Sequence, residues 1–380
     1  MNPTTAILGI GTALPAYTVA QADIADLMAD SLKDRPDLAR FARRIFKSCG
    51  VETRYTVEPS YLGSIETCCY LPSREQSDIP TTEERMKTYQ REALPLAIEA
   101  AKKAISEANR TSEQITHLIT VSCTGQFLPG LDVLLIRELQ LNPRVNRLPL
   151  IFQGCSAGLK AIQMARDVVP NAPDAHVLVV CVELCTLHFQ PVKEREALFA
   201  ASFFGDGASA CVIGEPGKEN RNYLELGTGY AVLLPDCTGD MTWEVGNHGF
   251  DLYLSPRIPK LLAAYLEEEL QFLLKGNFPE LWAIHPGGKG IVDSVQNVMN
   301  LTDQQTHYSR EILRTVGNLS SNTILFVLNA MQRDMELREK SSTEGVALAF
   351  GPGLTAELMR FTYVPTYSRS TQEQSHHALF

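Results

Sequence analysis

The sequence predicts an α/β protein in which helices pack in layers on a buried sheet. Short apolar runs of strand length alternate along the chain with longer segments whose apolar residues recur at helical spacing. Several of these runs, such as 177–187, are nearly continuous, which is typical of strands buried on both faces. An apolar fraction of 44% and a charged fraction of 21% are those of an ordinary globular protein.

The first half begins with a strand over 6–11 that ends in a Gly-Ile-Gly turn, followed by helical patterning over 21–49 that is broken at Pro36. Residues 58–86 are rich in Pro, Ser, Thr and charge, and we expect an excursion on the surface. The apolar residues at 94, 98, 101 and 105 share one face of a long helix. The remaining predicted elements of this half are strands over 115–122, 148–152, 175–183 and 208–213 and helices over 131–140 and 156–169.

The second half repeats this order more loosely. It is predicted to contain strands over 223–233, 281–285, 344–350 and 355–363 and helices over 257–274, 289–299, 304–315 and 321–338. No linker or low-complexity tract separates the halves, so residues 1–222 and 223–380 are expected to share one body. The polar tail over 365–380 is expected to be frayed.

Charge and hydropathy exclude several classes of function. The chain has 34 Lys and Arg against 44 Asp and Glu, a net charge of −10, which disfavours nucleic-acid binding. It has no run of 18 apolar residues that would span a membrane, and no signal-peptide pattern begins it. The sequence therefore predicts a cytoplasmic protein without nucleic-acid partners or a membrane span.

Nine cysteines are scattered without a CxxC pair or neighbouring histidines, so neither a disulfide framework nor a metal site is expected. Most of them are predicted to be small buried hydrophobic residues. Cys155 differs, because an apolar strand runs into the small-residue turn Gly-Cys-Ser-Ala-Gly and a helix then begins. The positive end of that helix is expected to lower the thiol pKa and favour a nucleophilic thiolate. A buried cysteine at a tight turn fits the local pattern equally well.

A cysteine nucleophile needs a base and a site that accepts negative charge. His285 ends a predicted strand before a Gly-rich turn, and Asn318 directly precedes the helix predicted over 321–338. Taken singly, a structural histidine and a helix N-cap are the commoner roles for such residues.

Together the three segments resemble the type III polyketide synthases, the chalcone synthase-like family. Gln-Gly-Cys155-Ser-Ala-Gly, Ile-His285-Pro-Gly-Gly and Gly-Asn318-Leu-Ser-Ser match its cysteine, histidine and asparagine motifs. The similarity extends over residues 5–363 and includes Phe-Gly-Asp-Gly after position 203 and the segment containing Gly351 and Pro352. The resemblance implies a thiolase-like fold: two βαβαβαββ halves in five αβαβα layers, within a homodimer.

The same resemblance implies the chemistry and the roles of the site residues. Cys155 would hold an acyl group from acyl-CoA as a thioester, paired with His285. His285 and Asn318 would stabilise the enolate that forms when malonyl-CoA loses CO2. Repeated condensation and cyclisation would follow, with CoA thioesters as substrates and with no further cofactor and no metal.

Further residues are assigned by the same resemblance. Phe204 and Phe250 match the two gate phenylalanines. Gly351 and Pro352 belong to the substrate cavity. Leu128 lies where one subunit reaches into its partner's cavity. The expected cavity residues also include Cys123, Thr124, Cys185 and His188. The expected CoA-binding residues are Arg40, Arg43, Lys47, Lys289 and Gly290; the first three share one helix face, which is also typical of a solvated surface.

The starter group is the least determined part of this prediction. Plant chalcone synthases carry hydroxyl residues at the positions of Cys123, Cys185 and His188, so the departure here disfavours a phenylpropanoid starter. An aliphatic, long-chain starter that yields alkylpyrones or alkylresorcinols, as in bacterial relatives, is favoured. The alternatives are a naphthalene-type or chalcone-like polyketide synthase, a ketoacyl synthase that makes one condensation on an acyl carrier protein, a cysteine hydrolase and a non-catalytic binding protein.

Overall fold

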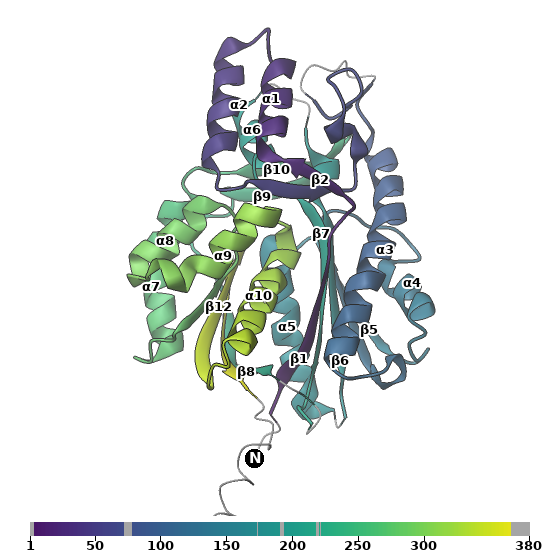
Figure 1. Cartoon of the computed structure of the whole chain (residues 1–380), viewed down its shortest axis with the longest axis vertical. Coiled ribbons are helices and arrows are strands. Elements are labelled where there is room, and N and C mark those ends of the chain that lie inside the picture. The colour runs from purple at the N-terminus through teal and green to yellow at the C-terminus, as the bar shows by residue number, and fades with distance from the viewer. Residues whose placement is uncertain are drawn as a thin grey trace, which may run out of the picture.

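The computed structural model describes residues 4–71, 78–172, 174–190, 194–217, 220 and 222–365 (Figure 1). The N-terminal half of the sheet has the order β1-β7-β6-β4-β5. Its strands are β1 (Ala6–Ala13), β4 (His117–Ser122), β5 (Asn146–Ile151), β6 (Val177–Leu184) and β7 (Asp206–Gly214). The C-terminal half has the order β8-β13-β12-β11. Its strands are β8 (Tyr223–Leu233), β11 (Leu281–Ile284), β12 (Thr343–Gly351) and β13 (Thr355–Val364).

The two half-sheets repeat one topology. In each half the first strand pairs antiparallel with the last, the last pairs antiparallel with the strand before it, and that strand pairs in parallel with an earlier one. Among the described residues the C-terminal half has no counterpart of the edge strand β5. A short antiparallel pairing of Ala6 with Glu225 and of Ile7 with Leu224 joins the halves.

Helices complete five layers. Helices α5 (Ala157–Val168) and α10 (Thr323–Leu337) lie between the half-sheets and share one apolar core with strands of both halves (Figure 1). Helices α3 (Thr82–Glu107) and α4 (Leu131–Glu138) cover the outer face of the N-terminal half. Helices α7 (Ile258–Leu274) and α8 (Lys289–Met299) cover that of the C-terminal half, and α9 (Asp303–Val316) packs against β11. This arrangement confirms the predicted thiolase-like fold.

A second group of elements, which we call the cap, covers the end of the sheet where the parallel strands finish (Figure 1). It contains α1 (Gln21–Ser31), α2 (Pro36–Ser48), α6 (Arg195–Ala201) and the strand pairs β2 (Tyr17–Ala20) with β3 (Thr53–Thr56) and β9 (Met241–Gly246) with β10 (Gly249–Leu254). The sequence predicted α1 and α2, with their break at Pro36, but missed α6 and both strand pairs.

The predicted turn at Gly9 and Gly11 is wrong, because β1 runs through both glycines. A Cβ at Gly9 would lie 2.3 Å from the backbone N of Ala108, and one at Gly11 would lie 2.1 Å from the carbonyl of Ala100. These glycines therefore let α3 pack directly on the strand. The buried face of α3 is made largely of alanine for the same reason, and Leu94 and Ile98 of the predicted face are only partly buried.

The segment over 58–86 is not simply a surface excursion. Its described part buries Tyr61, Cys68, Tyr70 and Leu71 in the core, and α3 already begins at Thr82 behind a capping box. Residues 72–77 of this segment and most of the predicted tail, 366–380, lie outside the described residues. No helix in the part of the chain that the structure describes is long and apolar enough to cross a bilayer.

Candidate active site

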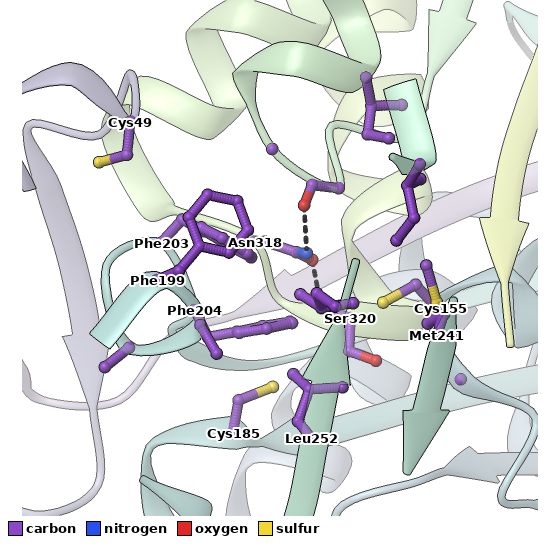
Figure 2. Close-up of a pocket in the computed structure, with 18 of the residues that line it drawn as sticks. Cys49, Cys155, Cys185, Phe199, Phe203, Phe204, Met241, Leu252, Asn318 and Ser320 are labelled. Carbon is purple, nitrogen blue, oxygen red and sulfur yellow. Dashed lines mark hydrogen bonds between the residues drawn. The ribbon is translucent and has the colours of Figure 1, made fainter. Parts of the chain in front are cut away.

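A cavity of about 420 Å³ lies beneath the cap, at the ends of β4, β6 and β11. Both halves of the chain and the cap contribute to its wall, so residues far apart in the sequence meet there (Figure 2). Cys155, His285 and Asn318 all line it. The three residues singled out in the sequence therefore face one enclosed space.

Cys155 lies in a single 3-10 turn, Gly154–Ser156, directly before α5. Gly154 has φ +69°, and a Cβ there would lie 2.2 Å from Cδ of Pro352 on the β12–β13 turn. Only glycine fits both the backbone conformation and the contact. The turn that presents the thiol is thus held against the other half of the protein.

The Cys155 thiol keeps some surface toward the cavity, but protein atoms surround it. Burial raises the pKa of this thiol to about 11, and the charge of Glu183 acts in the same direction. Hydrogen bonds with Ser320 and Asn318 lower the pKa, but by less. The predicted lowering of the thiol pKa by the helix end is therefore wrong for this structure, because loss of solvent outweighs it.

His285 follows β11, and its backbone N–H donates to the carbonyl of Leu348 at 2.8 Å. The side chain is only 1% exposed, and neither ring nitrogen has a hydrogen-bond partner among the residues that the structure describes. Burial lowers the pKa of the imidazole to about 3, so the ring is neutral at pH 7. The two pKa directions disfavour a resting thiolate–imidazolium pair and leave His285 with one N–H donor and one basic nitrogen.

Asn318 has its carboxamide turned in a defined direction (Figure 2). Its Oδ1 accepts from the backbone N–H of Ser320 at 2.8 Å and from Oγ1 of Thr323 at 3.3 Å. A backbone N–H can only donate, so the amide assignment is unambiguous. The Nδ2 group is left for the cavity side, where it also donates to the carbonyl of Gly287 at 3.3 Å. Asn318 therefore presents a donor to the cavity, as the sequence predicted.

Two buried carboxyl groups lie behind the cavity wall, Glu183 and Asp206. Glu183 accepts from Oγ1 of Thr124 at 2.7 Å, from the backbone N–H of Cys123 at 3.0 Å and from the hydroxyl of Ser321, and burial raises its pKa. Asp206 accepts from the backbone N–H of Thr186 at 2.8 Å, and burial raises its pKa to about 6. Neither residue lines the cavity, so both carboxyl groups hold backbone and side-chain donors behind its wall.

Most other predicted cavity residues are where the sequence placed them. The lining includes Phe204, Cys123, Thr124, Cys185, His188 and Pro352, but not Gly351. Leu128 lies outside the cavity and is 95% exposed.

The prediction that Phe250 lies at the cavity is wrong, because this residue does not line it. It is 1% exposed and stacks on His188 with ring centroids 4.3 Å apart. Leu252 and Leu254, two and four residues further along the same face of β10, form the wall in its place. His188 itself is fully engaged: Nε2 contacts the carbonyl of Thr124 at 2.6 Å and Nδ1 accepts from the backbone N–H of Phe250 at 3.0 Å.

The residues predicted to bind CoA fall into two groups. Lys289 and Gly290 line the cavity, next to Ser48 and Cys49 from the end of α2. Arg40, Arg43 and Lys47 are exposed on α2 and do not line it. Arg43 is already engaged by α1, with Nη2 3.0 Å from Asp30 and Nε 3.6 Å from Asp26. Because of these ion pairs, Arg43 is less free to bind CoA than Arg40 and Lys47 on the same helix face.

No pattern in the sequence had assigned several of the lining residues to the cavity. They come from the cap and from α8: Met241, Trp243, Leu252, Leu254, Phe199 and Ile291. Trp243 donates from Nε1 to the carbonyl of Cys123 at 2.6 Å, which ties β9 to the loop after β4. Ser320, next to Asn318, lies 3.2 Å through Oγ from the sulfur of Cys123. No group of three or more metal-ligating side chains gathers in the part of the chain that the structure describes.

Comparisons with known proteins agree with this geometry. Residues 2–216 match the N-terminal domain of chalcone and stilbene synthases, and residues 225–365 match the C-terminal domain. The chain is 32% identical to type III polyketide synthase C of Arabidopsis thaliana, over 93% of this chain and 94% of that protein. It is also 32% identical to type III polyketide synthase 10 of Oryza sativa, over 92% of this chain and 90% of the relative.

Solved structures show the same similarity. The C-terminal type III polyketide synthase domain of Steely1 from Dictyostelium superposes with a TM-score of 0.86 at 26% identity, covering 95% of this chain and 99% of that domain. PKS-I from the brown alga Ectocarpus siliculosus superposes with a TM-score of 0.85 at 25% identity, covering 96% and 99%.

Proposed function

Because the chain belongs to the chalcone and stilbene synthase family and is a type III polyketide synthase, a malonyl-CoA-dependent acyltransferase, we propose that it extends an aliphatic acyl starter held on Cys155. Cyclisation of the extended chain would give an alkylpyrone or an alkylresorcinol. One observation carries the proposal: Cys155, the unpartnered His285 and the donor face of Asn318 share one largely apolar cavity.

The first step is acyl transfer to the thiol. The sulfur of Cys155 attacks the thioester carbonyl of the acyl-CoA, and the basic nitrogen of His285 takes the thiol proton. The carbon–sulfur bond to CoA then breaks, and CoA leaves as a thiol after receiving that proton. The neutral imidazole has a lone pair without a hydrogen-bond partner among the described residues, so it can accept the proton. Because its pKa is low and that of the thiol is high, the proton moves only as the sulfur bonds to the carbonyl carbon.

The second step is decarboxylation of malonyl-CoA. The bond to the carboxylate breaks, CO2 leaves, and the electron pair becomes an enolate on the thioester oxygen. The Nδ2 group of Asn318 and the N–H of His285 are the donors that would stabilise this oxygen. The enolate carbon then attacks the Cys155 thioester, the bond from the acyl carbon to sulfur breaks, and the chain passes to the malonyl-derived CoA ester. The departing thiolate takes up one proton from solvent, which restores the Cys155 thiol.

In this proposal each half of the chain contributes part of the catalytic site. Residues 1–222 supply the thiol and residues 223–380 supply the imidazole and the carboxamide. The phenyl ring of Phe204 contributes an apolar wall, which disfavours a retained malonyl carboxylate because burying that charge is costly. The CoA portion would lie along Lys289, Gly290 and the end of α2. Arg40 and Lys47 would lie outside the cavity, on the exposed face of α2.

Several polar groups in the cavity wall are already hydrogen-bonded within the protein, which supports an aliphatic starter. The hydroxyl of Thr124 donates to Glu183, both ring nitrogens of His188 are engaged, and Nε1 of Trp243 donates to Cys123. These groups are therefore not available to hold a phenolic ring, whereas Met241, Leu252 and Leu254 offer apolar surface. An alkyl chain gains from such a wall without needing a hydrogen bond.

The experiment is a panel of acyl-CoA starters with malonyl-CoA and mass spectrometry of the products. We expect fatty acyl-CoA to be extended more than once and cyclised. Extension of aromatic or malonyl starters with no fatty acyl product would overturn the proposed starter. A single condensation on every starter would instead support the ketoacyl synthase alternative.

A homodimer is part of the proposal. Leu128 is 95% exposed, and Leu148 and Ile151 on the edge strand β5 are 40% and 50% exposed. An edge strand with exposed apolar residues is normally covered in a soluble assembly. Light scattering of the purified protein should give twice the mass of one chain, and a monomer would remove this part of the proposal.

A further inference from the structure

Arg54, on β3 of the cap, is a buried cation with an unusual set of partners. It is 2% exposed, and its Nη1 donates to the carbonyls of Ala201 at 2.6 Å and Phe204 at 2.9 Å. Its Nη2 donates to Oε1 of Gln21 at 2.7 Å. These hydrogen bonds all go to neutral oxygens. Burial lowers the pKa of the guanidinium to about 10, so the group still carries its charge at pH 7.

Gln21, the first residue of α1, extends this contact to the mouth of the cavity. Its Nε2 lies 2.6 Å from the carbonyl of Ser202, 3.2 Å from that of Phe46 and 3.0 Å from the sulfur of Cys49. Cys49 lines the cavity at the end of α2, and its thiol also contacts the Ser202 carbonyl at 3.3 Å. Arg54 and Gln21 together thus bind the end of α2 to the segment that carries Phe204.

The Phe204 segment is in turn paired with the segment of Asn318. The backbone N–H of Asn318 donates to the carbonyl of Phe203 at 2.8 Å, and the N–H of Gly205 donates to the carbonyl of Asn318 at 3.0 Å. Cβ of Arg54 lies against both segments: it is 3.4 Å from the position a Cβ would take at Gly205 and 3.6 Å from that at Gly317. Figure 2 shows Phe203, Phe204 and Asn318 close together on this side of the cavity.

We propose that Arg54 and Gln21 are positioning residues that hold Phe204 and the Asn318 carboxamide in register with the cavity mouth. A buried cation is costly, and replacing such a group with apolar residues often costs nothing in stability. Its value here is geometric, because a planar guanidinium with two donors directed at Ala201 and Phe204 fixes both carbonyls at once. The backbone turn of Cys155 is fixed by α5 and Pro352, whereas the hydrogen bonds of Arg54 go to Ala201, Phe204 and Gln21, so loss of the Arg54 contacts should displace the Phe204 and Asn318 segments more than the Cys155 turn.

This inference rests on the proposed roles of Cys155 and Asn318. It predicts that damage to the Arg54–Gln21 pair impairs malonyl decarboxylation more than acylation of Cys155. A displacement of about 1 Å in a positioning group can cost on the order of 100-fold in rate. Acylation depends on Cys155 and His285, whose backbone positions are set by α5, Pro352 and the end of β11, so it should be affected less.

The test uses Arg54→Lys and Gln21→Leu in the full-length protein. Acylation of Cys155 by a fatty acyl-CoA is followed by intact mass spectrometry, and CO2 release from malonyl-CoA is followed separately, with kcat and KM resolved. We expect kcat for CO2 release to fall about 10- to 100-fold in Arg54→Lys, while the acylation rate stays within about 3-fold. Gln21→Leu should show the same asymmetry with a smaller loss; if Arg54→Lys does not fold, this variant decides by the same criterion.

Arg85 offers a matched control. It too is buried, and it donates to the carbonyls of Leu187 at 2.5 Å, Phe189 at 3.1 Å and Pro80 at 2.9 Å, whereas Arg54 donates to those of Ala201 and Phe204. Arg85→Lys should lower the melting temperature as Arg54→Lys does, but keep the ratio of the two rates. Equal losses of both rates in the Arg54 and Gln21 variants, or no loss, would overturn the inference. Absence of acylation and CO2 release in the unsubstituted protein would instead overturn the proposed function.

Discussion

The backbone N–H of Ser320 donates to Oδ1 of Asn318 at 2.8 Å and so turns the amide nitrogen of Asn318 toward the cavity side. The carbonyl oxygen of the side chain is also held by Thr323, so rotating the amide would break two contacts and leave a backbone donor facing another donor. A donor fixed in this way costs no reorganisation when negative charge develops on a substrate oxygen.

Replacement of Asn318 by Asp tests this orientation with almost no change in volume. A carboxylate has no donor for an enolate oxygen and adds a negative charge, so CO2 release from malonyl-CoA should fall by about 100- to 1000-fold. Asn318→Ala should give a similar loss. Radiometric CO2 release measures the effect, and acylation of Cys155 is compared in Asn318→Ala, which adds no charge beside the thiol. A near-normal rate in the Asp variant would contradict the donor role.

The alkylation of Cys155 should report its raised pKa. With the thiol pKa at about 11 because of burial, the protonated form dominates from pH 7 to 9. The thiolate fraction, and with it the rate of reaction with iodoacetamide, should therefore rise about tenfold per pH unit over this range. Peptide mass mapping measures the rate of alkylation at Cys155, and the Cys155→Ala variant shows the background from the other cysteines. A plateau near pH 7 would show instead that the helix end or His285 stabilises the thiolate.

Gly154→Ala should destabilise the protein and impair acylation. The new Cβ would meet Cδ of Pro352 at 2.2 Å in a backbone conformation with φ +69°, so the turn or the facing loop must move. We expect a loss of about 1–3 kcal/mol in the free energy of unfolding, measured by denaturant titration. Gly239→Ala is the matched control, because nothing lies within 4 Å of its Cβ position. Similar stabilities for the two variants would refute this account of the turn.

The cations that we propose to bind CoA should differ in their effect on KM. Lys289 lines the cavity, whereas Arg43 is held by Asp26 and Asp30. Lys289→Ala should raise KM for malonyl-CoA by about 5- to 20-fold with little change in kcat, and Arg43→Ala should raise it less than about 3-fold. Initial rates at several salt concentrations measure both effects. A larger effect of Arg43 would mean that the guanidinium leaves α1 when CoA binds.

The order of elements was accessible from the sequence because it depends on local patterns, whereas Cys155, His285 and Asn318 were singled out together only by their resemblance to the motifs of a family. Apolar periodicity located β8, α7 and α8 within about a residue of their observed ends. The small-residue turn around Cys155 and the Gly-rich turn after His285 mark the ends of strands whatever the partners are. Short strands of the cap, such as β2 and β9, gave no comparable signal, since a partly exposed four- to six-residue strand has little periodicity.

Long-range packing determined the rest. The sequence placed Cys155 at a helix end and so indicated a low pKa, but enclosure by both halves reverses the direction. It matched Phe250 to a gate, but the stack on His188 hides that ring and leaves Leu252 at the wall. Nothing in the order of residues joins Gln21 and Arg54 to Phe204, which lies 150 positions after Arg54. Periodicity reports how each segment meets its neighbours in the chain, whereas solvent exclusion and hydrogen-bond partners depend on which distant segments the folded chain brings together.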